Sequence, residues 1–297
     1  MTSDPHPGPL PRERENVLQG PDYPAPAKLN LFLHVTGRRP DGYHLLQSAF
    51  VLIDRQDRIR LRVREDGVVR RVNEVAGIAE ADDLAVRAAQ LLKEATGTSL
   101  GAEIELEKSI PMGGGLGGGS SDAATVLMGL NRLWRTGLDP QRLRSLGARL
   151  GADVPFFLFG RNAWVEGIGE ILAPLEYPPR WYIVLVPPTP VATGGIFTAP
   201  ELTRNTEALK IEDFSAQPQD PRWVNDLQPV VIARYPEVRR HLEWLAGHGR
   251  ARLTGSGGCV FAGYDAREEA EAVMKAVPAS MQGFLARGMA RHPLSGN

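Results

Sequence analysis

The sequence has 297 residues, of which 42% are hydrophobic and 23% are charged, a composition typical of a soluble globular protein with one large or two mid-sized domains. Its 34 basic and 35 acidic residues give a formal net charge of -1, so no overall field favours a nucleic acid or an anionic membrane as the partner. The single cysteine, Cys259, excludes an internal disulfide and a multi-cysteine metal site, and it predicts a reducing, cytoplasmic location.

The first segment, residues 1–20, carries four prolines, several charges and no apolar block. It therefore lacks the apolar core of a secretory signal. We predict a disordered tail over these residues.

The first strand is predicted over residues 27–35, where side chains alternate with the period of two that is typical of a strand with one buried face. The odd-numbered apolar residues face the core. Lys28, Asn30, Phe32 and His34 share the opposite, exposed face. The polar side chains of Lys28 and Asn30 therefore point the same way and are separated by the rise of two strand residues.

A turn follows this strand, in the segment Arg38-Arg-Pro-Asp-Gly-Tyr-His44. Proline sets φ and glycine supplies a positive φ, so the Pro-Asp-Gly sequence predicts a tight turn that presents Tyr43 and His44. Strands are predicted next, over residues 45–53 and 59–64. Strands joined by turns in this way predict an antiparallel arrangement for this half of the sheet.

Two helices and a strand are predicted in the middle of the chain. Helical spacing of apolar side chains predicts a helix over residues 82–95, and alternation predicts a strand over residues 102–107. A further helix begins at Asp139 and stops at Gly151. Just after it, Asp153 is placed to cap the next helix.

A glycine-rich loop joins the strand at residues 102–107 to a helix with Ser120 or Ser121 as its N-cap and Asp122 in its first turn. Six glycines among seven residues let successive amides point into one concavity, where the helix dipole adds partial positive charge. The serine hydroxyls can reach a phosphate oxygen or a bound Mg²⁺. We predict that the loop binds ATP phosphates through Pro111, Met112, Gly113, Gly114, Gly115, Leu116, Gly117, Gly118, Gly119, Ser120 and Ser121.

Other interpretations of this loop fit the sequence less well. A flexible linker seldom lies between a clear strand and a capped helix. The P-loop pattern fails because no glycine in the chain precedes a lysine. A dinucleotide site needs an acid at a strand end about 20 residues on, and Asp139 instead begins a helix. The protein-kinase motifs HRD and DFG are absent.

The composition changes after residue 174, and a segment rich in proline, threonine and glycine follows at residues 187–220. We therefore predict a domain boundary near residue 175, with an N-terminal domain over residues 21–175 and a C-terminal domain over residues 176–297. The second half combines strands and helices in an α+β fold. Its predicted elements are a strand at residues 181–186, helices at 222–234 and 236–246, strands on either side of Gly255-Ser-Gly-Gly258, a helix, and a last strand near Phe284.

The apolar runs of the chain, such as residues 181–186, are far shorter than the ~20 residues that a membrane-spanning helix needs. We expect no membrane partner.

Two motifs resemble those of the GHMP kinase superfamily, which comprises galactokinase, homoserine kinase, mevalonate kinase and phosphomevalonate kinase. The glycine loop resembles its second motif, and Leu253-Thr-Gly-Ser-Gly-Gly258 resembles its third. The resemblance implies two domains, one like ribosomal protein S5 and one ferredoxin-like, with ATP and substrate bound in the cleft between them.

Four further segments are similar to the family of kinases that phosphorylate 4-diphosphocytidyl-2-C-methyl-D-erythritol. They are Pro26-Ala-Lys-Leu-Asn-Leu-Phe-Leu33, Arg39-Pro-Asp-Gly-Tyr-His44, Gly151-Ala-Asp-Val-Pro-Phe-Phe157 and Arg204-Asn-Thr206. The resemblance implies ATP-dependent transfer to the C2 hydroxyl of that compound, a step of the non-mevalonate isoprenoid pathway, with Mg²⁺ and a monomer or weak homodimer. A kinase of the mevalonate or homoserine class, and a non-catalytic nucleotide-binding relative, are the alternatives.

The resemblance also implies roles for single residues. Asp153 is the catalytic base, and Lys28 beside it stabilises charge at the reacting oxygens. Asn30 hydrogen-bonds the substrate, and Lys108 approaches the adenine or ribose of ATP. From the residues alone, Asp153 is equally a helix N-cap and Lys108 is equally a solvent-facing lysine, whereas for Lys28 a solvated surface lysine is the favoured interpretation.

A cytosine site is implied at Tyr43, His44 and Phe197. Two aromatic rings can sandwich a base, while the histidine contacts its polar edge. From the residues alone, these three are turn and core residues.

Overall fold

The structure is a computed structural model, and it describes residues 21–295. The predicted tail at residues 1–20 lies outside this range. Within it, ten strands form one sheet in the order β3-β4-β2-β10-β7-β9-β8, with β1 and β5 also paired to β2 and β6 paired to β5. The strands are β1 (Tyr23–Arg38), β2 (His44–Arg64), β3 (Val69–Arg71), β4 (Gly101–Glu107), β5 (Ala163–Glu166), β6 (Ile171–Pro174), β7 (Trp181–Val186), β8 (Arg252–Leu253), β9 (Val260–Tyr264) and β10 (Gln282–Met289).

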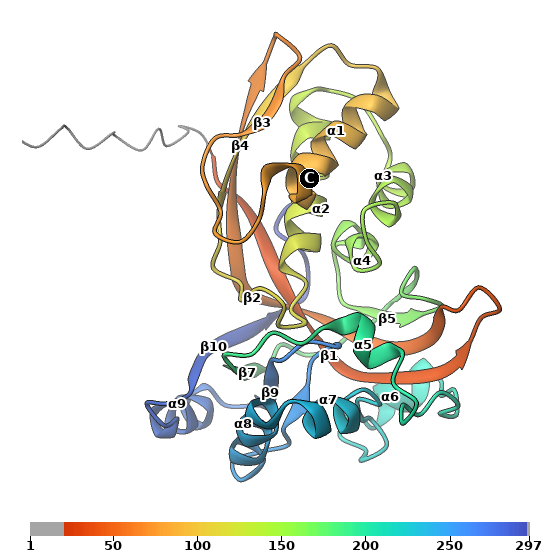
Figure 1. The fold of residues 1–297 in the computed structure, drawn as a ribbon, viewed down its shortest axis with the longest axis vertical. Coiled ribbons are helices and arrows are strands. Elements are labelled where there is room, and N and C mark those ends of the chain that lie inside the picture. Colours follow the sequence, from red (N-terminus) through yellow and green to blue (C-terminus); the bar gives the residue numbers. More distant parts are fainter. Residues whose placement is uncertain (1–20, 296–297) are drawn as a thin grey trace, which may run out of the picture.

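The helices lie in two groups at opposite ends of the molecule (Figure 1). The first group covers one face of the β3-β4-β2 part of the sheet, and the second lies around β7, β8 and β9. No helix in the described range is long and apolar enough to cross a membrane. The helices are α1 (Leu84–Thr96), α2 (Gly118–Leu133), α3 (Pro140–Ala148), α4 (Val154–Phe159), α5 (Thr193–Phe197), α6 (Ile211–Ala216), α7 (Gln228–Arg234), α8 (Pro236–Ala246) and α9 (Arg267–Ala276), with a short 3-10 turn at Glu80–Asp82.

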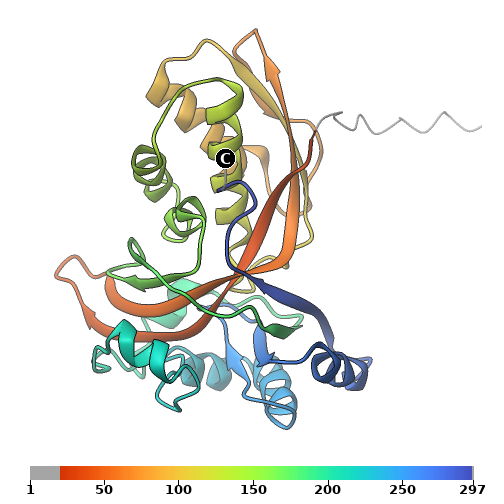
Figure 2. The ribbon, with the colours of Figure 1, turned by 180° about the vertical axis from the view of Figure 1, so that it is seen from behind.

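Strand β10 connects the two ends of the molecule. It pairs antiparallel with β7 along its length and with β2 at Gly288 and Met289. The chain then returns to the N-terminal helices (Figure 2). There, Arg132 of α2 donates a hydrogen bond to the Leu294 carbonyl at 2.5 Å. The sheet is thus continuous between the two groups of helices, and the boundary near residue 175 stays a prediction.

Strand β1 is buried on both faces, so the predicted exposed face is wrong. Lys28 and Asn30 are 3% and 1% exposed, and His34 is equally covered. Phe32 packs against the rings of Phe214 and Trp223, which belong to the C-terminal half of the chain. Segments about 180 residues further along therefore cover the face that the local alternation leaves polar.

Two helix starts differ from their predicted positions. Helix α2 begins at Gly118 with left-handed Gly117 as its N-cap, so Ser120 and Ser121 lie within its first turn instead of capping it. Helix α7 begins at Gln228, six residues later than expected, because the segment before it hydrogen-bonds to Leu33 of β1. Asp139 caps α3 as predicted, accepting a hydrogen bond from the Arg142 N–H.

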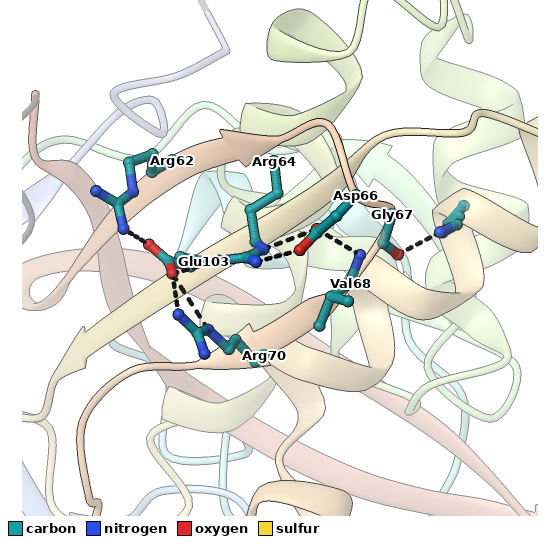
Figure 3. A network of polar contacts seen from close by, with 8 residues as sticks. Arg62, Arg64, Asp66, Gly67, Val68, Arg70 and Glu103 are labelled. Carbon is teal, nitrogen blue, oxygen red and sulfur yellow. Dashed lines mark hydrogen bonds and ion pairs between the residues drawn. The ribbon is translucent and has the colours of Figure 1, made fainter.

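A network of ion pairs links the short edge strand β3 to strands β4 and β2 (Figure 3). Glu103 of β4 is fully buried, and its carboxylate contacts the guanidinium groups of Arg62 and Arg64 from β2 and Arg70 from β3. The Arg70 and Arg64 contacts measure 2.5 and 2.7 Å. Burial raises the pKa of Glu103, but the hydrogen bonds from the three arginines outweigh burial and lower that pKa overall.

We expect Glu103→Gln to lower the free energy of unfolding by about 1–3 kcal/mol, because the buried group loses charge-assisted hydrogen bonds. Since the folded pKa is lowered, the carboxylate stabilises the fold above its unfolded pKa of about 4.3. The difference between wild type and variant should therefore fade as the pH falls below that value. Urea unfolding at several pH values measures it.

The matched control for this experiment is Glu176→Gln, which alters an exposed ion pair with Arg161. It should change stability by less than about 0.5 kcal/mol. Equal effects of the two substitutions would show that the buried network does not stabilise the fold.

Candidate active site

The loop between β4 and α2 forms a cradle of backbone amides. Gly113, Gly115 and Gly117 adopt positive φ angles of 68°, 79° and 74°, with one residue between each. Such alternation turns successive N–H groups toward one side, and the N-terminus of α2 adds its partial positive charge. Within residues 21–295, no protein acceptor takes the N–H groups of Gly115, Gly117 or Gly118. The geometry fits an anion such as a phosphate group.

The second glycine segment, between β8 and β9, lies directly against this loop. A Cβ atom added to Gly115 would lie 2.1 Å from the Thr254 carbonyl oxygen, and one added to Gly257 would lie 2.1 Å from the Gly115 nitrogen. The Cys259 N–H donates a hydrogen bond to the Gly114 carbonyl at 3.2 Å. Only glycine permits this approach of two backbones, which joins the two sequence motifs into one site.

Lys28 lies buried at the junction of the two loops. Its backbone N–H donates to the Leu116 carbonyl at 3.0 Å, which fixes β1 against the phosphate loop. Its Nζ donates to Asn30 Oδ1 at 2.6 Å, lies 3.4 Å from Asp153 Oδ2 and sits 4.6 Å from the centroid of the Phe50 ring. A buried ammonium needs partners of this kind, and Lys28 has them. The interpretation of Lys28 as a solvated surface lysine is therefore wrong.

Asp153 occupies the N-cap position of α4, but its side chain accepts no capping hydrogen bond. The carboxylate turns instead toward Lys28, and it remains 32% exposed. One side of this carboxylate is thus paired with a cation while the other is open to solvent. The geometry leaves it able to accept a hydrogen bond from a small molecule.

Asn30 is held by residues from distant parts of the chain. Its Nδ2 donates to Ser48 Oγ at 3.1 Å, and its backbone N–H donates to Thr254 Oγ1 at 3.0 Å. The sequence carries no signal for Ser48 or Phe50, because each is a single residue in an ordinary strand, and the motif that contains Thr254 does not indicate a role for its side chain. Their proximity follows from the pairing of β1 with β2 and from the contact between the glycine segments.

Ser121 and Ser120 differ in their surroundings. The Ser121 hydroxyl is buried and has no hydrogen-bond partner among the described residues, whereas Ser120 is half-buried and faces Gly151. An unpartnered hydroxyl at the phosphate-binding helix start suits a phosphate oxygen. The residues 21–295 contain no cluster of three acidic, histidine or cysteine side chains that could hold a metal ion. Mg²⁺ held through ATP phosphates and Ser120 or Ser121 stays a prediction.

Lys108 lies beside the phosphate loop between two carboxylates, so it is not the solvent-facing lysine of the alternative interpretation. Its Nζ is 2.5 Å from Asp57 and 2.6 Å from Asp122. Burial raises the pKa of Asp122 to about 8; the Lys108 ammonium opposes that rise and Asp57 adds to it. Asp57 also accepts the N–H groups of Ser109 and Ile110 and thereby fixes the start of the loop. Contact of Lys108 with adenine or ribose stays a prediction.

A second cluster of rings contains two of the three residues expected to bind cytosine. The His44 and Phe197 ring centroids are 5.3 Å apart and the rings are tilted by 35°. Tyr43 is 60% exposed at the turn, and no ring contact joins it to Phe197 in the described part of the chain. The Arg204 guanidinium, which the sequence did not assign to this cluster, donates from Nε to His44 Nε2 at 3.1 Å.

Comparison with known proteins identifies the class. Residues 83–161 match the N-terminal domain of GHMP kinases, and residues 201–283 match the GHMP kinase C-terminal domain. A crystal structure of mevalonate kinase superposes with a TM-score of 0.65 at 14% identity, over 92% of this chain and 100% of that one. The fold is that of the GHMP kinases, which confirms the predicted α+β class.

Relatives of higher identity define the family within that class. A 4-diphosphocytidyl-2-C-methyl-D-erythritol kinase from Thiobacillus denitrificans is 58% identical over 92% of this chain and 96% of its own length. One from Aromatoleum aromaticum is 55% identical over 93% and 95%. A crystal structure of a 4-(cytidine 5'-diphospho)-2C-methyl-D-erythritol kinase matches at 35% identity with a TM-score of 0.79, over 90% of this chain and 98% of that one. The chain belongs to the 4-diphosphocytidyl-2-C-methyl-D-erythritol kinase family.

The contact between the two glycine segments leads to a prediction. Gly257→Ala should lower the affinity for ATP about 10- to 100-fold, because a methyl group forced against the Gly115 backbone costs about 1–3 kcal/mol and displaces the loop. Titration calorimetry with ATP measures the change. The control is Gly247→Ala at the end of α8, where an added Cβ would meet its nearest neighbour, the Trp244 carbonyl oxygen, at an ordinary 3.4 Å. Wild-type affinity in both variants would contradict the assignment of this loop pair to ATP.

Proposed function

We propose that this protein transfers the γ-phosphoryl group of ATP to the C2 hydroxyl of 4-diphosphocytidyl-2-C-methyl-D-erythritol. The observation that supports this most directly is the position of Lys28. Its buried ammonium bridges toward Asp153 while its own backbone is bonded to the phosphate loop. A basic carboxylate, a cation and a phosphate cradle therefore meet at one point, which is the requirement for phosphorylating an alcohol.

The acceptor hydroxyl donates its hydrogen bond to the open side of the Asp153 carboxylate, which takes the proton as the oxygen attacks the γ-phosphorus in line. The bond from that phosphorus to the β,γ-bridging oxygen breaks, and ADP leaves with the bond's electrons. Lys28 Nζ stabilises the negative charge that develops on the reacting oxygens. Asn30, fixed by Ser48 and Thr254, orients the substrate. The amides of the glycine loop hold the phosphates against the start of α2. Ser120 or Ser121 would hold Mg²⁺ together with the ATP phosphates, where it would supply neutralisation of their charge.

The cytidyl group of the substrate lies at the cluster of His44 and Phe197, with Tyr43 at its open edge. Phe197 offers a ring face to the base, and His44 offers polar ring atoms to its edge. This cluster distinguishes the proposed substrate from mevalonate and homoserine, which carry no nucleobase. A mevalonate- or homoserine-class kinase and a non-catalytic relative remain the competing functions.

Further properties belong to the same proposal. The one cysteine of the chain, Cys259, is buried as a thiol against Gly114, which suits a reducing cytoplasm. Charge balance makes a nucleic acid an unsuitable partner, and the small-molecule substrate is the proposed one. The proposed assembly is a monomer or weak homodimer.

A coupled assay of ADP release tests the function. We expect turnover with ATP, Mg²⁺ and the cytidyl substrate, and none with mevalonate or homoserine under the same conditions. Turnover of mevalonate or homoserine without turnover of the cytidyl substrate would contradict the proposal. Absence of turnover with all three would favour the non-catalytic relative.

The proton-accepting role of Asp153 is tested by Asp153→Asn. We expect kcat to fall about 10²- to 10⁴-fold, because an amide cannot accept the proton. The buried Lys28 ammonium also loses its charged partner, so the free energy of unfolding is measured alongside kcat, and the assay is made where the variant is fully folded. The matched control is Asp139→Asn, at the N-cap of α3, where asparagine caps as well as aspartate and kcat should stay at the wild-type value. Near-normal turnover by Asp153→Asn would remove the assignment.

A further inference from the structure

Arg204, in the segment between α5 and α6, contacts both residues of the proposed nucleobase site, the ring of His44 and the backbone of Phe197. Its Nε donates to His44 Nε2 at 3.1 Å. One terminal nitrogen donates to the carbonyl oxygens of Phe197 and Ala199 at 3.1 and 2.5 Å, and the other donates to the Leu202 carbonyl at 2.9 Å. One guanidinium therefore fixes the histidine ring and the backbone of the phenylalanine that packs against it.

The bond to His44 determines which ring nitrogen carries the proton. A guanidinium can only donate hydrogen bonds, so His44 Nε2 must be the acceptor and must be unprotonated. A neutral imidazole has one protonated nitrogen, which is then Nδ1. The charged groups that face this ring are Arg204 and, from the end of β1, Arg38. Burial, Arg204 and Arg38 all lower the pKa of His44, which keeps the ring neutral.

A fixed Nδ1–H group discriminates between pyrimidines. Cytosine offers acceptors at N3 and O2, whereas uracil carries a hydrogen on N3. A donor that cannot change its tautomer can therefore bond to N3 of cytosine but opposes the N3–H of uracil. A histidine free to move its proton to Nε2 would present an acceptor at Nδ1 and would lose this distinction.

We propose that Arg204 is a positioning residue that locks His44 in the Nδ1–H tautomer and thereby makes the nucleobase site select cytosine over uracil. The inference rests on the proposed function, because it takes His44 and Phe197 as the site of the cytidyl group. It adds the cause of the base selectivity, which lies in a residue behind the ring and not in a direct contact with the base.

A purely structural role for Arg204 makes different predictions, and Arg234 provides the control for it. Arg234 also tethers this region, by donating to the Gly195 carbonyl of α5 at 2.8 Å and by pairing with Glu201. No contact with His44 appears for it among the described residues. Arg234→Gln therefore removes a comparable tether without changing the partner of the histidine, whereas Arg204→Gln removes both.

The first measurement is the protonation of His44 in the full-length wild-type protein, by long-range proton–nitrogen NMR of the imidazole groups. His44→Gln identifies the His44 signals among those of the six histidines. We expect a proton on Nδ1 and none on Nε2 at neutral pH. Protonation on Nε2 would overturn the inference whatever the substrate proves to be, so this result is independent of the proposed function.

The second measurement compares kcat/KM for the cytidyl substrate with that for its uridyl counterpart. Arg204→Gln should raise KM for the cytidyl substrate about 10- to 100-fold, with kcat little changed, and should lower the cytidyl-to-uridyl preference by a similar factor. Arg234→Gln should keep the wild-type preference. Loss of Arg204 removes one cause of the lowered pKa of His44, and protonation of the ring at low pH puts a proton on Nδ1 again, so the cytidyl-to-uridyl preference of Arg204→Gln should recover as the pH falls.

The outcomes separate the two proposals. Equal losses for cytidyl and uridyl substrates in Arg204→Gln, with the Nδ1 proton retained, would leave Arg204 a structural tether and overturn the inference. Failure of the wild type to phosphorylate either substrate would overturn the proposed function while the NMR result still stood. If Arg204→Gln does not fold, the cytidyl-to-uridyl preference is measured with Arg204→Lys instead, and the NMR spectrum of the wild-type protein still tests the tautomer of His44.

Discussion

The site depends on the close contact between two glycine segments that lie about 140 residues apart in the sequence. Gly115 and Gly257 approach so closely that no side chain fits between their backbones. This contact brings the phosphate loop of the N-terminal half against the β8–β9 connection of the C-terminal half. Strand β1 is bonded to both, through the Lys28 N–H to Leu116 and the Asn30 N–H to Thr254. Lys28 and Asn30 are therefore positioned relative to this junction.

Buried cations flank the junction, and each is stabilised by a different set of partners. Lys28 has one carboxylate, one amide oxygen and one aromatic ring, and it keeps Asp153 within reach of solvent. Lys108 contacts the carboxyl groups of Asp57 and Asp122, which connect it to the first residues of the loop and to the start of α2. Since an unpaired buried charge is costly, these partners are conditions for placing positive charge beside bound phosphate at all. Lys28 Nζ lies 3.4 Å from Asp153 Oδ2. The Asp153 carboxylate is therefore oriented by the ion pair and still partly exposed to solvent.

Recognition of the substrate is built from a different kind of contact. The ring of His44 is oriented by Arg204, which also holds the backbone at Phe197. The proposed nucleobase site and the proposed phosphate site are therefore supported separately, one by a guanidinium fork and the other by packed backbones. Under the proposed function, the second cluster determines which molecule is phosphorylated, and the junction of the glycine segments positions the reacting groups.

The sequence by itself determined the elements whose signals are local: the strand, glycine loop and helix order around residues 111–121, the turn before Tyr43, the cap of α3 at Asp139, and α8 at its observed bounds. It could not determine that Lys28 is buried, because the groups around it come from separate elements that packing brings together: Phe50 of β2, Leu116 of the glycine loop and Asp153 before α4. It could not find Asp57, a single polar residue, and the motifs that contain Thr254 and Arg204 do not indicate the distant partners of these side chains. Tertiary structure decided the partner of every charged group in the site, because hydrogen bonds and ion pairs form between atoms that packing, and not sequence spacing, brings together.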